Sequence, residues 1–166
     1  YTHQTKYTLP IPPSPNLPNM KAVYLYPATC YFEATPVSLG RGTSLPFQIY
    51  GHPNMTGYDY SFTPKSVPGA KNPPQLNKLC HGVNLSNMSD EEIWKRGVDL
   101  SYVIDAYKNL NIGDHFFRPF FELLVGTDYV RKMIIEGKSA EEIKNRWKGD
   151  VEKFKEQRKP YLLYQE

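Results

Sequence analysis

The positions of the prolines divide this chain into two parts. Of its 15 prolines, all except Pro119 and Pro160 lie before residue 75. Proline fixes φ and has no amide hydrogen, so it interrupts both helices and strand ladders. The first part is therefore predicted to contain short strands between irregular loops, and long helices are expected only after residue 88. A chain of 166 residues is long enough for one domain with its own core.

Residues 9–18 read LPIPPSPNLP, which is typical of an extended segment close to polyproline II. Three aliphatic side chains favour a strap packed across a domain surface over a free linker: Leu9, Ile11 and Leu17. Apolar runs between turn signals predict short strands at 22–26, 47–50, 60–63, 83–85 and 161–164. Such short strands with long connections predict a small, distorted and partly barrel-like sheet.

Helical signals dominate residues 89–166. Ser89 and Ser139 each precede a glutamate three residues later, which is the capping-box pattern at the start of a helix. Gly97 is expected to separate two helices, and a further helix is expected from Thr127. The clearest helix should run from Ser139 to about residue 159, with an apolar inner face made of Ala140, Ile143, Trp147, Val151 and Phe154.

These patterns predict the α+β class, with C-terminal helices packed on the sheet. We expect residues 1–166 to form one subdomain. Its parts would be a proline-rich strap over 1–20, a β-rich part with the site loop over 21–88, and a mainly helical part with a final strand over 89–166.

Charge is spread unevenly along the chain. The net charge is +3; residues 1–88 hold six Lys/Arg and two Asp/Glu, and residues 89–166 hold fourteen and fifteen. Because glutamates interrupt every basic block, the pattern argues against nucleic-acid binding. No apolar run approaches the length of a membrane span. Phosphate-binding glycine motifs are also missing from the sequence, so no cofactor is expected.

Polar side chains are concentrated between Tyr26 and Thr43. Glu33 follows two aromatic residues, and Arg41 lies between glycines that let a ligand approach the backbone. A guanidinium matches a carboxylate or phosphate, and a carboxylate accepts hydroxyl groups or acts as a general acid. The pair could form a binding site together with Ser38 and Thr43. It could equally be an internal ion pair that fastens the loop.

The two cysteines leave two alternatives open. Cys30 and Cys80 could form a disulfide, or they could be two buried thiols. With His52 and His81 they could supply zinc ligands, but their spacing fits no compact zinc motif, so no metal site is expected.

Several strings resemble the C-terminal part of the NamZ-type exo-β-N-acetylmuramidases, a family long known only as a domain of unknown function. They are PPSPNLP at 12–18, YPATCYFEAT at 26–35, VSLGRGT at 37–43, Pro46-Phe47, Gly51, Cys80 with Gly82, and the closing Trp147, Phe154, Arg158 and YLLY at 161–164. The resemblance implies removal of terminal N-acetylmuramic acid from peptidoglycan fragments. It also implies a two-part molecule with an N-terminal Rossmann-like domain and a cleft between the two parts. That domain, with the family's proposed catalytic glutamate, is absent from this sequence.

The resemblance gives the polar segment a role. Arg41 would hold the lactyl carboxylate of N-acetylmuramic acid, and Glu33 would accept sugar hydroxyls or act as a second carboxylate. Ser38, Thr43, Asn16 and Ser14 are further candidates for contacts with peptidoglycan saccharides. The resemblance also implies export, with an inactive fragment that needs its N-terminal domain as partner. The alternatives are a cell-wall carbohydrate-binding module and a purely structural support domain.

Overall fold

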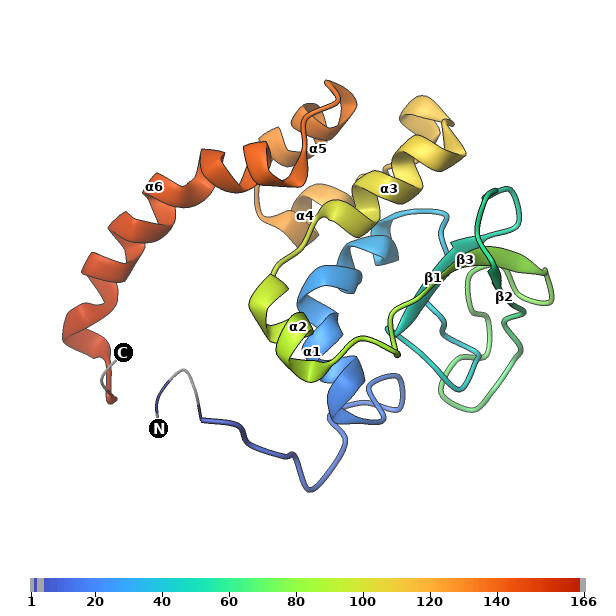
Figure 1. Cartoon of the computed structure of the whole chain (residues 1–166), viewed down its shortest axis with the longest axis horizontal. Helices are drawn as coiled ribbons and strands as arrows, with labels where there is room; N and C mark the ends of the chain where they lie inside the picture. The colour runs from blue at the N-terminus through green and yellow to red at the C-terminus, as the bar shows by residue number, and fades with distance from the viewer. Residues whose placement is uncertain (1, 3–4, 165–166) are drawn as a thin grey trace.

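Three short strands form the sheet in this computed structural model, which describes residue 2 and residues 5–164 (Figure 1). They are β1 (Ile49–His52), β2 (Tyr60–Phe62) and β3 (Cys80–Asn84), in the antiparallel order β1-β3-β2. Tyr50 lies opposite Val83, and Phe62 lies opposite Cys80. Three strands of this length do not close on themselves, so the prediction of a partly barrel-like sheet was wrong. The α+β class is confirmed.

Residues 22–26, predicted as a strand, belong instead to helix α1 (Met20–Thr29). The Asn19 side chain accepts a hydrogen bond from the Ala22 amide at 2.9 Å and begins the helix. Leu25 and Ala28 bury the inner face of α1, and Pro27 is accommodated in its last turn. Core packing therefore outweighs both the β propensity of this run and the helix-breaking effect of one proline. The 21–88 part is consequently not purely β-rich.

The sequence signals at Ser89, Gly97 and Ser139 mark helix boundaries as predicted. Ser89 caps α2, Gly97 ends it with φ 57°, and Ser139 forms a full capping box with Glu142. Thr127 does not cap a helix, since the nearby helix begins two residues later without a side-chain cap. The elements are α2 (Asp90–Arg96), α3 (Ser101–Leu110), η2 (Gly113–His115), α4 (Phe121–Val125), α5 (Tyr129–Ile135), α6 (Ala140–Arg158) and η3 (Lys159–Tyr161).

The main core surrounds α1 and the 3₁₀ helix η1 (Cys30–Ala34). Helices α2 and α3 contact α1, and α4 contacts η1, so most C-terminal helices are separated from the sheet (Figure 1). Helix α3 also reaches β1, where the rings of Tyr102 and Tyr50 lie 6.0 Å apart. A second, smaller core under the sheet contains Ile49, Phe62 and Cys80.

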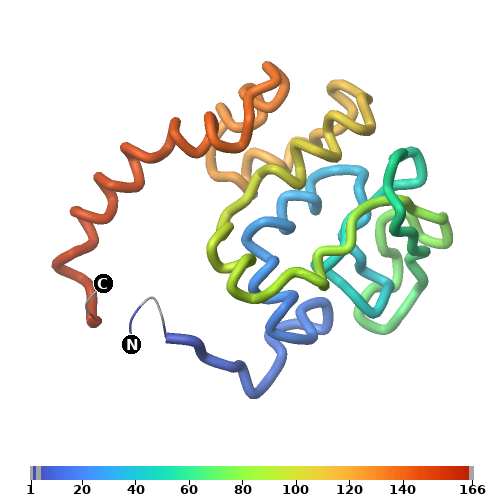
Figure 2. Tube along the Cα trace, viewed as in Figure 1, coloured from blue at the N-terminus to red at the C-terminus, as the bar shows by residue number. Residues whose placement is uncertain are grey.

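The two ends of the chain differ from the predictions. Residues 161–164 form no strand; Tyr161 ends η3 and the residues after it are exposed. In the strap, Leu17 packs against the core, whereas Leu9 and Ile11 are exposed; residues 1, 3 and 4 of the predicted strap lie outside the described residues. Figure 2 shows the trace of α6 leaving the body of the domain.

Candidate functional site

The η1 helix directs Glu33 outward. In a 3₁₀ helix, side chains three residues apart lie on one side, so Cys30 and Glu33 share a face. Tyr31, Phe32 and Ala34 are buried on the other faces and anchor the helix in the core. The hydroxyl of Thr35 donates to the Phe32 carbonyl at 2.9 Å and ends η1. The carboxylate therefore stands on a rigid support.

The loop after η1 presents Arg41. Ser38 pairs with Gly51 of β1 through two backbone hydrogen bonds of 2.8 and 2.9 Å, which fix one end of the loop. Gly40 and Gly42 have φ of 83° and 81°, a conformation that side chains other than glycine rarely adopt. The Gly42 carbonyl accepts the Lys65 amide at 2.9 Å, so the loop is held on both sides of Arg41.

Glu33 and Arg41 form an ion pair. Nη2 of Arg41 donates to Oε2 of Glu33 at 2.7 Å, and the side chains are 34% and 24% exposed, respectively. The guanidinium carbon also lies 5.3 Å from the centre of the Phe47 ring, a cation–π contact. Within the described chain, neither Oε1 of Glu33 nor Nη1 of Arg41 makes a hydrogen bond. The pair can therefore bind a polar ligand without first breaking.

Two neutral groups complete this surface. The Tyr26 ring packs on Phe47 with centroids 5.1 Å apart, and burial followed by the Glu33 charge raises the pKa of the phenol. Burial, with a contribution from Glu33, raises the pKa of the Cys30 thiol to about 11. Both groups stay protonated at neutral pH, so the thiol is not an activated nucleophile. We call Tyr26, Cys30, Glu33 and Arg41 the polar site.

Ser38 and Thr43 hold the loop in shape. The Ser38 hydroxyl is fully buried and accepts the Gly40 amide at 3.4 Å. The Thr43 hydroxyl donates to the Gly40 carbonyl at 2.7 Å and accepts the Leu45 amide at 3.0 Å. These hydrogen bonds stabilise the loop conformation that presents Arg41.

Ser14 and Asn16 fasten the strap. The Asn16 side-chain amide donates to the Gly69 carbonyl at 2.9 Å, and Ser14 Oγ accepts the Asn16 amide at 3.2 Å. None of these hydrogen bonds connects them to Glu33 or Arg41.

The cysteines lie in different clusters. Cys30 borders the main core, Cys80 belongs to the smaller one, and both are free thiols. The structure therefore contains the packed-thiol alternative and not the disulfide. Burial raises the pKa of Cys80 to about 11 as well. Among residues 2 and 5–164, no group of three His, Cys, Asp or Glu side chains could hold a metal ion.

Asp105 is a supporting residue that the sequence did not reveal. Its Oδ2 accepts hydrogen bonds from the hydroxyls of Tyr50 at 2.8 Å and Tyr58 at 2.7 Å. Tyr50 in turn stacks on Phe32, the neighbour of Glu33, with centroids 4.8 Å apart. Tyr50 and Asp105 are 55 positions apart in the sequence, so no local pattern indicated that they are hydrogen-bonded.

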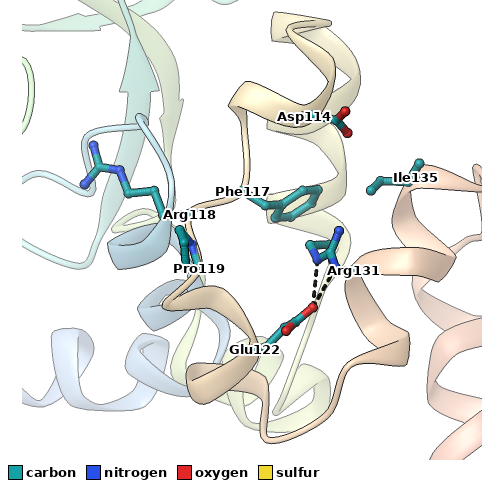
Figure 3. Close-up of a pocket in the computed structure, with 7 residues that line it drawn as sticks. All are labelled: Asp114, Phe117, Arg118, Pro119, Glu122, Arg131 and Ile135. Carbon is teal, nitrogen blue, oxygen red and sulfur yellow. Dashed lines mark hydrogen bonds and ion pairs between the residues drawn. The ribbon is translucent and has the colours of Figure 1, made fainter.

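A polar pocket lies next to the supporting elements of the site (Figure 3). It has a volume of about 340 Å³, and Glu122 and Arg131 pair across it at 2.7 Å. The Arg118 amide donates to the Ala34 carbonyl at 2.9 Å, which connects the pocket wall to η1. The Arg118 side chain points away from Arg131. Sequence patterns had not indicated this pocket.

Fold and site together define a small α+β domain that displays a carboxylate and a guanidinium side by side on rigid supports. The family described as "Exo-beta-N-acetylmuramidase NamZ, C-terminal" matches residues 24–164. This chain belongs to that family, and the resemblance predicted from its sequence is confirmed. Each helix of the described residues is too short or too polar to cross a bilayer.

Similar proteins of known sequence or structure belong to the same family. The chain is 34% identical over 167 residues to the peptidoglycan β-N-acetylmuramidase NamZ of Bacillus subtilis strain 168, covering 92% of this chain and 40% of that protein. A crystal structure of the DUF1343 family protein BF0379 from Bacteroides fragilis NCTC 9343 is 82% identical, with a TM-score of 0.98 over 100% of this chain and 47% of that one. The B. fragilis protein BF0371 shares the fold at 20% identity, with a TM-score of 0.65 over 93% of this chain and 45% of its own. This chain thus spans less than half the length of these relatives.

Proposed function

We propose that this chain is the C-terminal part of an exo-β-N-acetylmuramidase and that the polar site forms one wall of its substrate cleft. The observation that carries the proposal is the Glu33–Arg41 pair, partly exposed and with hydrogen-bonding capacity left on both partners. Family membership and the name of the B. subtilis relative supply the substrate class.

The chemistry of N-acetylmuramic acid suits this pair. Its lactyl carboxylate matches the free Nη1 edge of Arg41, because guanidinium groups bind carboxylates through parallel hydrogen bonds. The free Oε1 of Glu33 is an acceptor for a sugar hydroxyl. The protonated Tyr26 phenol can donate a further hydrogen bond from the same surface. Binding and orientation of the sugar ring are therefore the proposed roles of this chain.

Hydrolysis needs more than this chain provides. Glycoside hydrolysis generally uses two carboxyl groups on opposite sides of the scissile bond. Glu33 is the carboxylate of the polar site, so we assign the other to the part of the protein that the longer relatives carry in addition. The 166-residue chain alone is expected to be inactive. Because the substrate belongs to the cell wall, we also propose that the protein is exported.

The test uses a polypeptide that joins the N-terminal portion of BF0379 to this chain, called here the joined polypeptide. Release of N-acetylmuramic acid from a defined disaccharide is measured for the unchanged form, Arg41→Ala and, as a matched surface control, Lys71→Ala. Loss of a charge-assisted hydrogen bond, about 1.5–3 kcal/mol, predicts that Arg41→Ala lowers kcat/KM about ten- to hundredfold. The control should leave it unchanged. Normal kinetics of Arg41→Ala would refute the proposal that Arg41 binds the lactyl carboxylate.

Calorimetric titration of the 166-residue chain with the same disaccharide separates the alternatives. Weak or absent binding is expected, because one wall of a cleft makes only part of the contacts. Tight binding by the isolated chain would instead identify a carbohydrate-binding module. A structural support domain would show no binding, and in the joined polypeptide Arg41→Ala would alter only the melting temperature.

A further inference from the structure

The N-terminal half of helix α6 packs against the core, whereas the apolar side chains of its C-terminal half are exposed to solvent. Ile143, Trp147, Val151 and Phe154 follow one another at spacings of four, four and three residues, so they form a single stripe. Ile143 is fully buried and Trp147 packs against the core. Val151 and Phe154, on the same stripe, are 42% and 59% exposed. The apolar stripe that packs on the core at its first two residues is therefore exposed at its last two.

The segment after α6 also exposes apolar side chains. Tyr161, Leu162, Leu163 and Tyr164 are all exposed, and Leu163 reaches 91%. Large exposed apolar patches on a protein surface often mark sites where a partner binds. The family match continues to residue 164, so this segment belongs to the domain. In Figure 1 the strap, with its exposed Ile11, projects from the same side of the body as the second half of α6.

An apolar pocket lies where the stripe leaves the body. It has a volume of about 270 Å³ and is lined mainly by apolar side chains that include Val98, Leu100, Val130, Trp147 and Val151. The pocket therefore suits an apolar side chain of a docked partner.

We propose that the part of the polypeptide carried by the longer relatives docks on this surface, inserting an apolar side chain into the pocket and covering Val151, Phe154 and residues 161–164. The length comparison identifies this occupant. All of this chain aligns with 47% of BF0379 at a TM-score of 0.98, so more than half of that protein lies outside the domain. Nothing in the polar site enters this argument, so the inference stands independently of the proposed sugar binding.

The docked portion would fix the position of the polar site. Tyr31 of η1 lines the apolar pocket, and Glu33, two residues later, belongs to the polar site. A body seated in the pocket therefore contacts the same short helix that carries the carboxylate.

Thiol labelling tests the proposal without measuring activity. Phe154→Cys, Leu163→Cys and the control Glu156→Cys, on the opposite side of α6, are made in the 166-residue chain and in the joined polypeptide. Modification by a maleimide is followed residue by residue with mass spectrometry, which separates the native Cys30 and Cys80. Circular dichroism confirms that each variant is folded.

The expected result is protection at positions 154 and 163 only in the joined polypeptide. Labelling there should slow by about tenfold or more, because covered thiols react only from a minor open population. Glu156→Cys should react equally in both forms. Equal rates for Phe154→Cys in both forms would overturn the proposal. Protection in the 166-residue chain that increases with its concentration would also overturn it, since a second copy would then be the occupant.

Discussion

Nη2 of Arg41 and Oε2 of Glu33 lie 2.7 Å apart, joining the loop between η1 and β1 to η1 itself. Both side chains are partly exposed, and each retains an atom free for a ligand. The two interpretations of this pair, an internal fastening and a binding site, differ in what its removal changes.

Glu33→Gln should affect function more than stability. A partly exposed ion pair contributes about 0–1 kcal/mol, so the free energy of unfolding of the 166-residue chain should change little in a urea titration. In the joined polypeptide, kcat/KM should fall about tenfold or more, since a charged acceptor is lost. The reverse outcome, a large loss of stability with unchanged kinetics, would identify the pair as an internal fastening.

Asp105→Ala should destabilise the domain clearly. The change leaves the hydroxyls of Tyr50 and Tyr58 without their common acceptor, at a cost of about 2–4 kcal/mol in the free energy of unfolding. Tyr58→Phe removes one donor and keeps the Tyr50 bond, so a loss of about 1 kcal/mol is expected. Urea titrations followed by tyrosine and tryptophan fluorescence compare the two. Equal effects would show that Asp105 does not connect α3 to η1.

The Cys30 thiol should react slowly until strongly alkaline pH. Its pKa rises from an ordinary 9.0 to about 11 because burial and Glu33 disfavour the thiolate. A raised pKa means that the folded state keeps its proton longer than the unfolded state. The contribution of Cys30 to stability is then complete below pH 9 and is lost as the pH passes through 11. Alkylation of Cys30 by iodoacetamide against pH measures this; a midpoint near 9 would contradict the burial.

Ser139→Ala should weaken the start of α6. The substitution removes the hydroxyl that accepts the Glu142 amide at 3.2 Å, at a cost of about 1 kcal/mol in stability. Glu141→Ala, in the same turn but outside the capping box, is the matched control and should cost less. Melting curves by circular dichroism compare them. If both variants melt alike, the capping box does not stabilise α6.

Signals carried by neighbouring residues predicted the corresponding parts of the molecule. The serine–glutamate pairs at Ser89 and Ser139 marked true helix starts, and Gly97 marked a true helix end. The placement of Arg41 and Glu33 in one polar segment was also visible, because they are only eight positions apart in the sequence. Such signals survive because a cap or a turn depends on hydrogen bonds within a few residues.

Predictions that depended on distant partners were less successful. The run at 22–26 has strand composition, yet it lies in α1 because its buried face packs against α2 and α3. Asp105 supports η1 from α3, and no local pattern could reveal the two tyrosines that it binds. The helical face of α6 was recognised, but only half of it is covered by this chain.

The sequence by itself determined the helix caps at Ser89 and Ser139, the helix end at Gly97 and the proximity of Glu33 and Arg41 in one polar segment, since these rest on local chemistry. Tertiary structure decided the helical state of α1, the open three-stranded sheet, the separate positions of Cys30 and Cys80, and the bare half of α6. Those outcomes depend on burial between segments far apart in the chain, where packing free energy exceeds local preference.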